Sequence, residues 1–95
     1  MRKGFVYILT NKPYGTLYIG MTSNMPRRLM QHRNGTASAF TKKYGLTRLV
    51  YVEVHDLVTT AIARESSLKR WKREWKIDLI ESVNSSWKEL DNTLV

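Results

Sequence analysis

Residues 4–22 read GFVYILTNKPYGTLYIGMT. Apolar side chains alternate along two runs of this stretch, 4–10 and 16–20, as they do in half-buried β-strands. The segment between the runs contains a proline and a glycine, which are typical of a chain reversal. We therefore expect the fold to begin with a β-hairpin.

Two tyrosines, Tyr7 and Tyr18, occupy matching positions in these runs, on the phase opposite to the residues that would face a core. With a four-residue loop at 11–14, Thr10 pairs with Gly15, and Tyr7 then lies directly across from Tyr18. Two phenols would share one face of the sheet. Cross-strand aromatic pairs stabilise ordinary sheets by roughly 0.2–1 kcal/mol, so packing alone is one explanation of the pair. The residues that follow favour a functional one.

The composition indicates one compact domain over residues 1–95. A chain of 95 residues with 42% hydrophobic content can bury one modest core. It has no cysteine, which excludes a disulfide framework and zinc sites built on thiolates. The longest apolar run near the N-terminus, 5–9, is too short for a signal or a membrane span. We expect a cytoplasmic protein that does not contact a membrane.

Positive charge is concentrated in the first half of the sequence. The formal net charge is +8, and no Asp or Glu precedes Glu53. Residues 1–52 carry nine Lys and Arg, whereas residues 53–95 carry seven basic and eight acidic side chains. Because unbalanced positive charge attracts polyanions, we expect the half that contains the hairpin to face nucleic acid.

The rest of the sequence predicts helices and one more strand. The expected elements are a helix at 26–33 preceded by a cap at 22–24, a loop at 36–46, a strand at 48–55, a helix from 56 or 59 to 72, and a helix at 75–83. Three tryptophans recur at spacings typical of helix packing, and we expect them in the core: Trp71, Trp75 and Trp87. We expect residues 91–95 to fray. The predicted fold is α/β, with a central three-stranded antiparallel sheet flanked by helices.

Arg28 and His32 form the first group of residues with chemical potential. They are four residues apart on the first expected helix, so their side chains share one face, beside an apolar stripe of Met25 and Leu29. An arginine supplies a permanent planar cation that matches phosphate oxygens, and a histidine can transfer a proton near neutral pH. The alternative is a solvated basic end of a helix.

Glu65 is the second candidate. It lies among residues that form an apolar stripe at helical spacing: Ala61, Ile62 and Leu68. An ionised carboxylate that faces a core is costly unless a cation, hydrogen bonds or a metal compensates it. One explanation is a salt bridge to an arginine such as Arg64 or Arg28. The other is a metal site, because Mg²⁺ is commonly held by one or two carboxylates together with substrate phosphates and water.

These motifs together resemble the GIY-YIG nuclease domain, over nearly the whole chain. The resemblance rests on VYI at 6–8, YIG at 18–20, the Arg-x-x-x-His helix and the later helical Glu. It implies that Tyr7 and Tyr18 are the motif tyrosines, Gly20 the motif glycine, Arg28 the catalytic arginine, His32 the helix histidine, Glu65 the metal-binding carboxylate and Asn84 the late polar residue. Where the family has Gly-Ile-Tyr, this chain has Phe5-Val6-Tyr7, which keeps the phenol but lacks the glycine.

The resemblance implies a metal-dependent endonuclease that hydrolyses phosphodiester bonds in nucleic acid, with DNA as the expected substrate. Mg²⁺ or Mn²⁺ would be the cofactor, held by Glu65, with no small-molecule cofactor beside it. Arg28 would neutralise charge in the transition state, and either Tyr7 or Tyr18 would activate water with His32 as a proton relay. The expected contacts to nucleic acid are Arg27, Lys42, Lys43 and Asn84. The alternative is a nucleic-acid-binding module of the same fold with little or no turnover.

Overall fold

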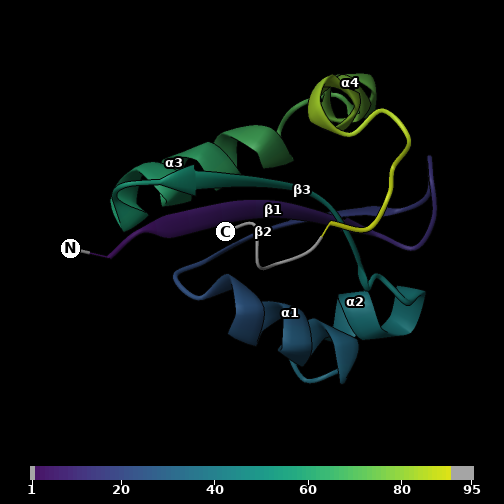
Figure 1. The fold of residues 1–95 in the computed structure, drawn as a ribbon, viewed down its shortest axis with the longest axis horizontal. Helices are drawn as coiled ribbons and strands as arrows, with labels where there is room; N and C mark the ends of the chain where they lie inside the picture. Colours follow the sequence, from purple (N-terminus) through teal and green to yellow (C-terminus); the bar gives the residue numbers. More distant parts are fainter. Residues whose placement is uncertain (1, 91–95) are drawn as a thin grey trace.

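The structure is a computed structural model, and it describes residues 2–90. In this range the chain forms three strands and four helices (Figure 1). In chain order they are β1 (Gly4–Thr10), β2 (Leu17–Thr22), α1 (Met25–Arg33), α2 (Ala39–Tyr44), β3 (Arg48–His55), α3 (Val58–Lys69) and α4 (Arg73–Val83). Residues 91–95, which we expected to fray, lie outside the described range.

The three strands form one antiparallel sheet in the order β2-β1-β3, which confirms the predicted fold class. β1 is the central strand, and every side chain from Val6 to Thr10 is buried. Both faces of the sheet are covered: α1 and α2 lie on one side, and α3 and α4 lie on the other (Figure 1). Because helices cover both faces of the sheet, no side chain of β1 between Val6 and Thr10 faces solvent.

This double cover changes the environment that we predicted for Tyr7. The Tyr7 side chain is fully buried. It packs in a core with Leu9 of the same strand, Met25 and Leu29 of α1, and Leu46 and Leu49 near the start of β3. The opposite face of β1 belongs to a second core with residues of α3 and α4: Val6, Ile8, Ala61, Leu68 and Ile80. We predicted that Tyr7 lies on a face of β1 away from the core. That prediction was wrong, because α1 and α2 cover this face and the Tyr7 side chain is buried beneath them (Figure 1).

The register of the hairpin differs from the predicted one by two residues. Thr10 pairs with Leu17, so Tyr7 lies across from Gly20, and Tyr18 lies across from Leu9. The connection therefore spans residues 11–16. Its side-chain and backbone bonds hold this longer loop closed: the Asn11 side chain accepts from the Thr16 amide at 3.1 Å, and the Gly15 amide donates to Lys12 O at 2.9 Å.

A register shift of two residues leaves every side chain on its original face, because strand side chains alternate with period two. Tyr7 and Tyr18 therefore still share a face, but as diagonal neighbours whose ring centroids are 6.4 Å apart. The hairpin loop is also fixed to α4, since the Arg73 guanidinium donates to the carbonyl oxygens of Tyr14 and Gly15, each at 2.7 Å.

α1 follows the predicted pattern closely. The Asn24 side chain accepts from the Arg27 amide at 3.1 Å, and Pro26 occupies the first turn, where its missing N–H costs nothing. α2 was not predicted. The Ser38 side chain accepts from the Thr41 amide at 3.3 Å, and Gly45 ends the helix in the left-handed conformation with φ 64°. The segment expected to be a loop thus contains one and a half turns of helix.

α3 and α4 are two helices as predicted, separated by a turn at residues 70–72. The tryptophans near them differ in burial. Trp87 is fully buried, Trp71 packs partly against the core, and Trp75 is 49% exposed, so only Trp87 fulfils the expectation of a buried core residue. Within residues 2–90, no helix is long and apolar enough to cross a membrane.

Candidate active site on the α1 face of the sheet

A hydrogen bond between Tyr7 and His32 lies at the centre of the site. Tyr7 Oη is 2.8 Å from His32 Nε2, and both side chains are buried. The two residues come from the central strand and from α1, which lies against one side of the sheet (Figure 1). The apolar stripe of α1, Met25 and Leu29, packs into the same core and brings His32 to the phenol. The predicted face of α1 is thus the one that meets the sheet.

The other nitrogen of His32 leads to a residue that the sequence did not indicate. His32 Nδ1 is 3.0 Å from Thr41 Oγ1, and Thr41 Oγ1 is 3.2 Å from the Ser38 carbonyl oxygen. A carbonyl oxygen only accepts, so the hydroxyl of Thr41 donates to Ser38 and accepts from Nδ1–H. This network places the His32 proton on Nδ1 and leaves Nε2 as the acceptor for the Tyr7 hydroxyl.

Burial and neighbouring charges keep both groups of this pair neutral near pH 7. Burial raises the pKa of Tyr7 to about 12, the nearby Tyr18 adds to the rise, and the Arg28 guanidinium beside the phenol opposes it. Burial also lowers the pKa of His32 below its usual value of 6.5, and the positive charge of Arg28 lowers it further. A neutral imidazole that accepts a bond from a neutral phenol is therefore the resting arrangement.

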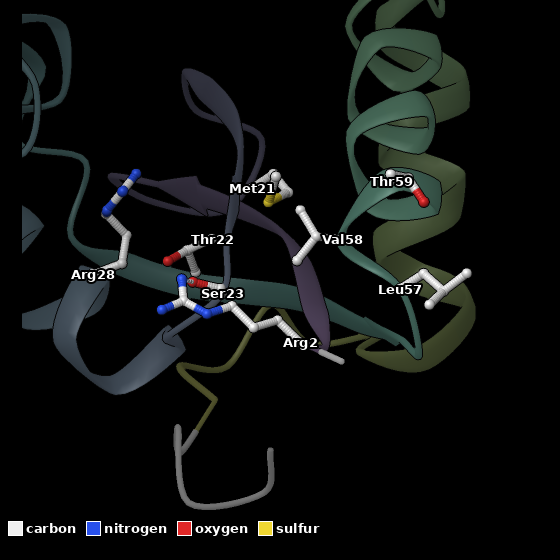
Figure 2. A pocket seen from close by; sticks show the side chains of 8 residues that line it. All are labelled: Arg2, Met21, Thr22, Ser23, Arg28, Leu57, Val58 and Thr59. Atoms are coloured by element: carbon white, nitrogen blue, oxygen red, sulfur yellow. Dashed lines mark hydrogen bonds between the residues drawn. The ribbon is translucent and has the colours of Figure 1, made fainter.

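Arg28 lies one turn before His32 on α1 and is half-buried. Its Nε donates to Gln31 Oε1 at 3.2 Å, which fixes the direction of the guanidinium. Arg28 lines two neighbouring cavities, of about 600 and 240 Å³, which share Thr22 and Ser23 (Figure 2). The larger one extends between Arg2, Met21 and the start of α3, and the smaller one reaches Asn24, Arg27 and Gln31. Arg28 thus borders both hollows, with Arg2 on the larger and Arg27 on the smaller.

Tyr18 completes an aromatic cluster on the same face. Its ring centroid is 5.4 Å from that of His32, in an edge-on arrangement, and 6.4 Å from that of Tyr7. On its other side, Tyr18 stacks on Phe40 of α2 at 6.2 Å. Tyr18 is half-buried, and among the described residues its hydroxyl has no hydrogen-bond partner, unlike that of Tyr7.

Glu65 lies on α3, and its negative charge contributes to the raised pKa of Tyr7. Its side chain is 22% exposed, and a loose ion pair of 3.7 Å joins it to Lys69 one turn along the helix. It is paired with neither of the arginines considered above: Arg64 binds Glu53 instead, at 2.9 Å. Its predicted surroundings were partly wrong, since Ala61 and Leu68 are buried but Ile62 is 46% exposed.

The donor set around Glu65 suits a hard divalent cation held mainly by substrate and water. Within residues 2–90 no group of three or more His, Asp or Glu side chains could hold a metal ion. One half-buried carboxylate, loosely paired to an exposed lysine, is free to supply a single protein ligand. That is the mode in which Mg²⁺ binds when phosphate oxygens complete its shell.

The predicted contacts to nucleic acid occupy different environments. Arg27, Lys42 and Lys43 are exposed, and Arg27 borders the smaller cavity. Asn84 is 7% exposed, and its amide is fully engaged within the chain: it donates to Val50 O at 3.0 Å and to Lys88 O at 2.8 Å, and accepts from the Lys88 amide at 3.1 Å. An amide with these bonds ties the end of α4 to β3, so we revise its role from a nucleic-acid contact to a structural one.

Sequence reasoning missed two residues of the site, Thr41 and Gln31. Each is ordinary in sequence, and each acts by orienting a neighbour: Thr41 fixes the tautomer of His32, and Gln31 fixes the direction of Arg28. The cap signal Ser38-x-x-Thr41 followed by Gly45 was present and could have revealed α2. It would not have shown that Thr41 reaches His32.

Comparison with known proteins identifies relatives over most of the chain. The sequence profile described as the GIY-YIG catalytic domain matches residues 3–78. A UPF0213 protein of Staphylococcus saprophyticus is 35% identical over 80 residues, which cover 84% of this chain and 96% of that protein. A UPF0213 protein of Clostridium perfringens is 37% identical over 78 residues, covering 82% of this chain and 83% of its own.

A solved structure has a similar fold. The solution NMR structure of a UPF0213 protein from Bacillus halodurans superposes with a TM-score of 0.58 at 26% sequence identity, and covers 92% of each chain.

Proposed function

Because the chain belongs to the GIY-YIG family, we propose that it is a metal-dependent endonuclease that hydrolyses phosphodiester bonds in DNA. The observation that carries this proposal is the buried bond of 2.8 Å between Tyr7 and His32, together with the neighbouring Arg28, which borders two hollows. A phenol, an imidazole and a guanidinium in this arrangement combine a proton acceptor with a phosphate ligand. Sheet packing alone explains none of these polar contacts.

Tyr7 is the tyrosine best placed to activate water. With its pKa raised to about 12, the phenol is protonated at neutral pH and is a poor base by itself. His32 Nε2 accepts its proton, however, so Tyr7 can take a proton from water as it passes its own to His32. The hydroxide attacks phosphorus as the P–O bond to the leaving oxygen breaks. The imidazolium beside Arg28 is disfavoured and releases its proton to water, and water protonates the departed oxygen. Tyr18 has no such acceptor among the described residues.

Arg28 binds the scissile phosphate in this mechanism. Its planar guanidinium matches two oxygens of one phosphate. As the pentavalent transition state gains negative charge, a cation that Gln31 already holds in place stabilises it without reorganisation. Arg2, on the larger hollow, and Arg27, on the smaller, would contact the neighbouring phosphates.

Glu65 would hold Mg²⁺ or Mn²⁺, together with substrate oxygens and water. When bound, the ion supplies Lewis-acid polarisation of the phosphate and stabilises charge on the leaving oxygen. Without a cation, the Glu65 carboxylate would repel the phosphate of the substrate, because both are anions. This repulsion makes the site selective for metal-loaded substrate.

The test is a cleavage assay on labelled single-stranded, duplex and branched DNA, with Mg²⁺ or with a chelator. We expect metal-dependent products from the wild type and a loss of about 10²–10⁴-fold in rate for Tyr7→Phe. Tyr14→Phe is the matched control. Tyr14 lies in the exposed hairpin loop, and the substitution removes a tyrosine hydroxyl that donates to Glu81 of α4. Tight binding without cleavage in any metal would instead identify a nucleic-acid-binding module. Equal rates for Tyr7→Phe and wild type would refute the relay.

A further inference from the structure

α2 presents two large aromatic rings to solvent. Phe40 and Tyr44 are each 45% exposed, and they lie one turn apart on the same face of the helix, with ring centroids separated by 4.9 Å. The buried face of α2 is the one that carries Thr41. We refer to Phe40 and Tyr44 together as the aromatic ledge. Two adjacent exposed rings are costly to leave in water, so a ligand that covers them is favoured.

The ledge is continuous with the active site. Phe40 stacks on Tyr18 at a centroid distance of 6.2 Å and an interplanar angle of 30°. Tyr18 in turn lies 6.4 Å from Tyr7. The rings therefore form an unbroken series from the buried phenol to the surface of α2. α1, which carries Arg28, lies on the same side of the sheet as α2 (Figure 1).

The charge around the ledge complements a nucleic-acid strand. Lys43 Nζ lies 5.3 Å from the centroid of the Tyr44 ring. Lys42, the preceding residue of the helix, is also exposed. No acidic residue occurs in the sequence before Glu53. The carboxylate of Glu89, which reaches this side of the molecule, is paired with Arg33 of α1. Exposed aromatic rings with flanking lysines are the combination with which proteins bind bases and phosphates of single strands.

A second exposed aromatic pair provides the contrast. Trp71 and Trp75 meet edge to face at 6.3 Å, and Lys72 lies over the Trp75 ring at 5.3 Å. Both tryptophans line a hollow that also contains Asp78, however. This hollow lies on the side of the sheet that α3 and α4 cover, opposite α1 and α2 (Figure 1). Both pairs thus have an exposed ring and a nearby lysine, whereas continuity with Tyr18 and Tyr7 distinguishes the ledge.

We propose that Phe40 and Tyr44 form a stacking subsite for an unpaired nucleobase next to the phosphate that Arg28 binds. The proposal rests on the proposed function, because it assumes that nucleic acid enters the hollow at Arg28. Bases inside a duplex already stack on one another and do not offer a free face. The ledge therefore selects substrates with an unstacked base near the cut, in a single strand, a loop or a frayed end.

The experiment measures binding to labelled oligothymidylate in chelator, so that the strand stays intact. A strand with the same number of phosphates but abasic sugars serves as the second probe, and Phe40→Leu and Tyr44→Leu are the test variants. We expect wild type to bind the thymidine strand about 5- to 100-fold more tightly than the abasic one. Each leucine variant should reduce this ratio and leave affinity for the abasic strand unchanged.

Two controls separate stacking from other effects. Trp75→Leu removes a similarly exposed ring on α4, and Tyr44→Phe keeps the π-face while removing a hydroxyl; both should retain the wild-type preference. Melting curves show whether a leucine variant is folded. If one variant does not fold, the other variant and the wild-type comparison of the two strands still decide the question.

The outcomes keep this inference distinct from the proposed function. Equal wild-type affinity for the two strands would overturn the stacking subsite, even if the same protein cleaves DNA with Mg²⁺. A preference for thymidine that both leucine variants preserve would also overturn it, since another surface would then bind the bases. If wild type binds neither strand and cleaves no DNA, the proposed function fails together with the inference, and the ledge would be a contact for another class of partner.

Discussion

Gly20 lies directly across from Tyr7 in the β1–β2 ladder, and the Tyr7 ring extends over the place where a side chain at residue 20 would be. A Cβ on Gly20 would lie 2.5 Å from Tyr7 Cζ and closer still to the hydroxyl. The ring cannot yield easily, because it is buried and bonded to His32 at 2.8 Å. A glycine in the middle of a strand, usually unfavourable, is here required by the orientation of the phenol.

We therefore expect Gly20→Ala to destabilise the fold by about 1–3 kcal/mol, the range for overpacking a core. It should also reduce cleavage beyond what the loss of stability explains, because the displaced ring loses its bond to His32. Urea unfolding and cleavage rates measured at a temperature where the variant is folded would test both effects. Wild-type values for both would show that the ring can move aside freely.

Thr41 should control the protonation state of His32. Thr41→Val removes the acceptor of Nδ1–H and frees the proton to move to Nε2, where it blocks transfer from Tyr7. We expect a fall in kcat of about 10²-fold or more. Thr41→Ser keeps the hydroxyl and should restore most of the rate.

The pH profile distinguishes this positioning role from a loss of packing. The relay needs neutral His32, so activity should fall as the pH drops through the pKa of His32, which burial and Arg28 hold below 6.5. In Thr41→Val the imidazolium loses a hydrogen-bond acceptor, so the acid limb should move to lower pH. An unmoved limb together with reduced kcat would indicate that Thr41 acts only through packing.

Glu65→Gln tests the metal-binding role. We expect metal-dependent cleavage to be lost while DNA binding in chelator is retained or tightened, because a negative charge near the phosphate is removed. Stability in chelator should change by less than about 1 kcal/mol, since the lost pair with Lys69 is exposed and loose. Glu74→Gln, on the exposed start of α4, is a matched control. Cleavage preserved in Glu65→Gln would exclude the carboxylate as an essential ligand.

Glu53 links β3 to α3 and should make stability depend on acid pH. Burial alone would raise its pKa, but hydrogen bonds from Tyr51, His55 and Arg64 lower the pKa below the usual value of 4.5. A depressed folded-state pKa stabilises the fold above the unfolded value, and this contribution is lost as the pH falls through the folded value.

Glu53→Gln should accordingly destabilise the protein by about 1–3 kcal/mol at neutral pH, because it weakens three bonds to a charged group. The difference from wild type should shrink as the pH is lowered below about 4.5 in urea unfolding experiments. Asp78→Asn, an exposed acid on α4, should show no comparable dependence. A Glu53→Gln defect that is constant with pH would mean that shape, and not charge, matters at this position.

Much of the fold could be predicted because its signals are local. The cap at Asn24 and the valine-rich third strand each act within a few residues, and the expected bounds of β1 and β3 agree with the structure. The register of the hairpin could not be derived in the same way. It depends on the Asn11 and Gly15 bonds that close a six-residue loop, and composition does not distinguish this loop from a shorter one.

The site divides along the same line. Tyr7, Tyr18, Arg28 and His32 lie together as the motif spacing implied, because strand and helix periodicity assign each of them to a face. Thr41 and Phe40 were beyond reach, since a six-residue helix has little intrinsic stability and its position comes from tertiary contacts. The burial of Tyr7 was missed for a related reason: a strand does not reveal from its own sequence that both its faces are covered.

The bond chain from Tyr7 through His32 to Thr41 joins two parts of the molecule that differ in local stability. Tyr7 lies on the strand paired on both sides, whose amides should exchange with solvent only when the whole domain unfolds. Thr41 lies on the short helix α2, where opening should be local and frequent. Hydrogen exchange would reveal the two rates. A substrate that packs against α2 would slow its opening and so keep the proton acceptor oriented for longer.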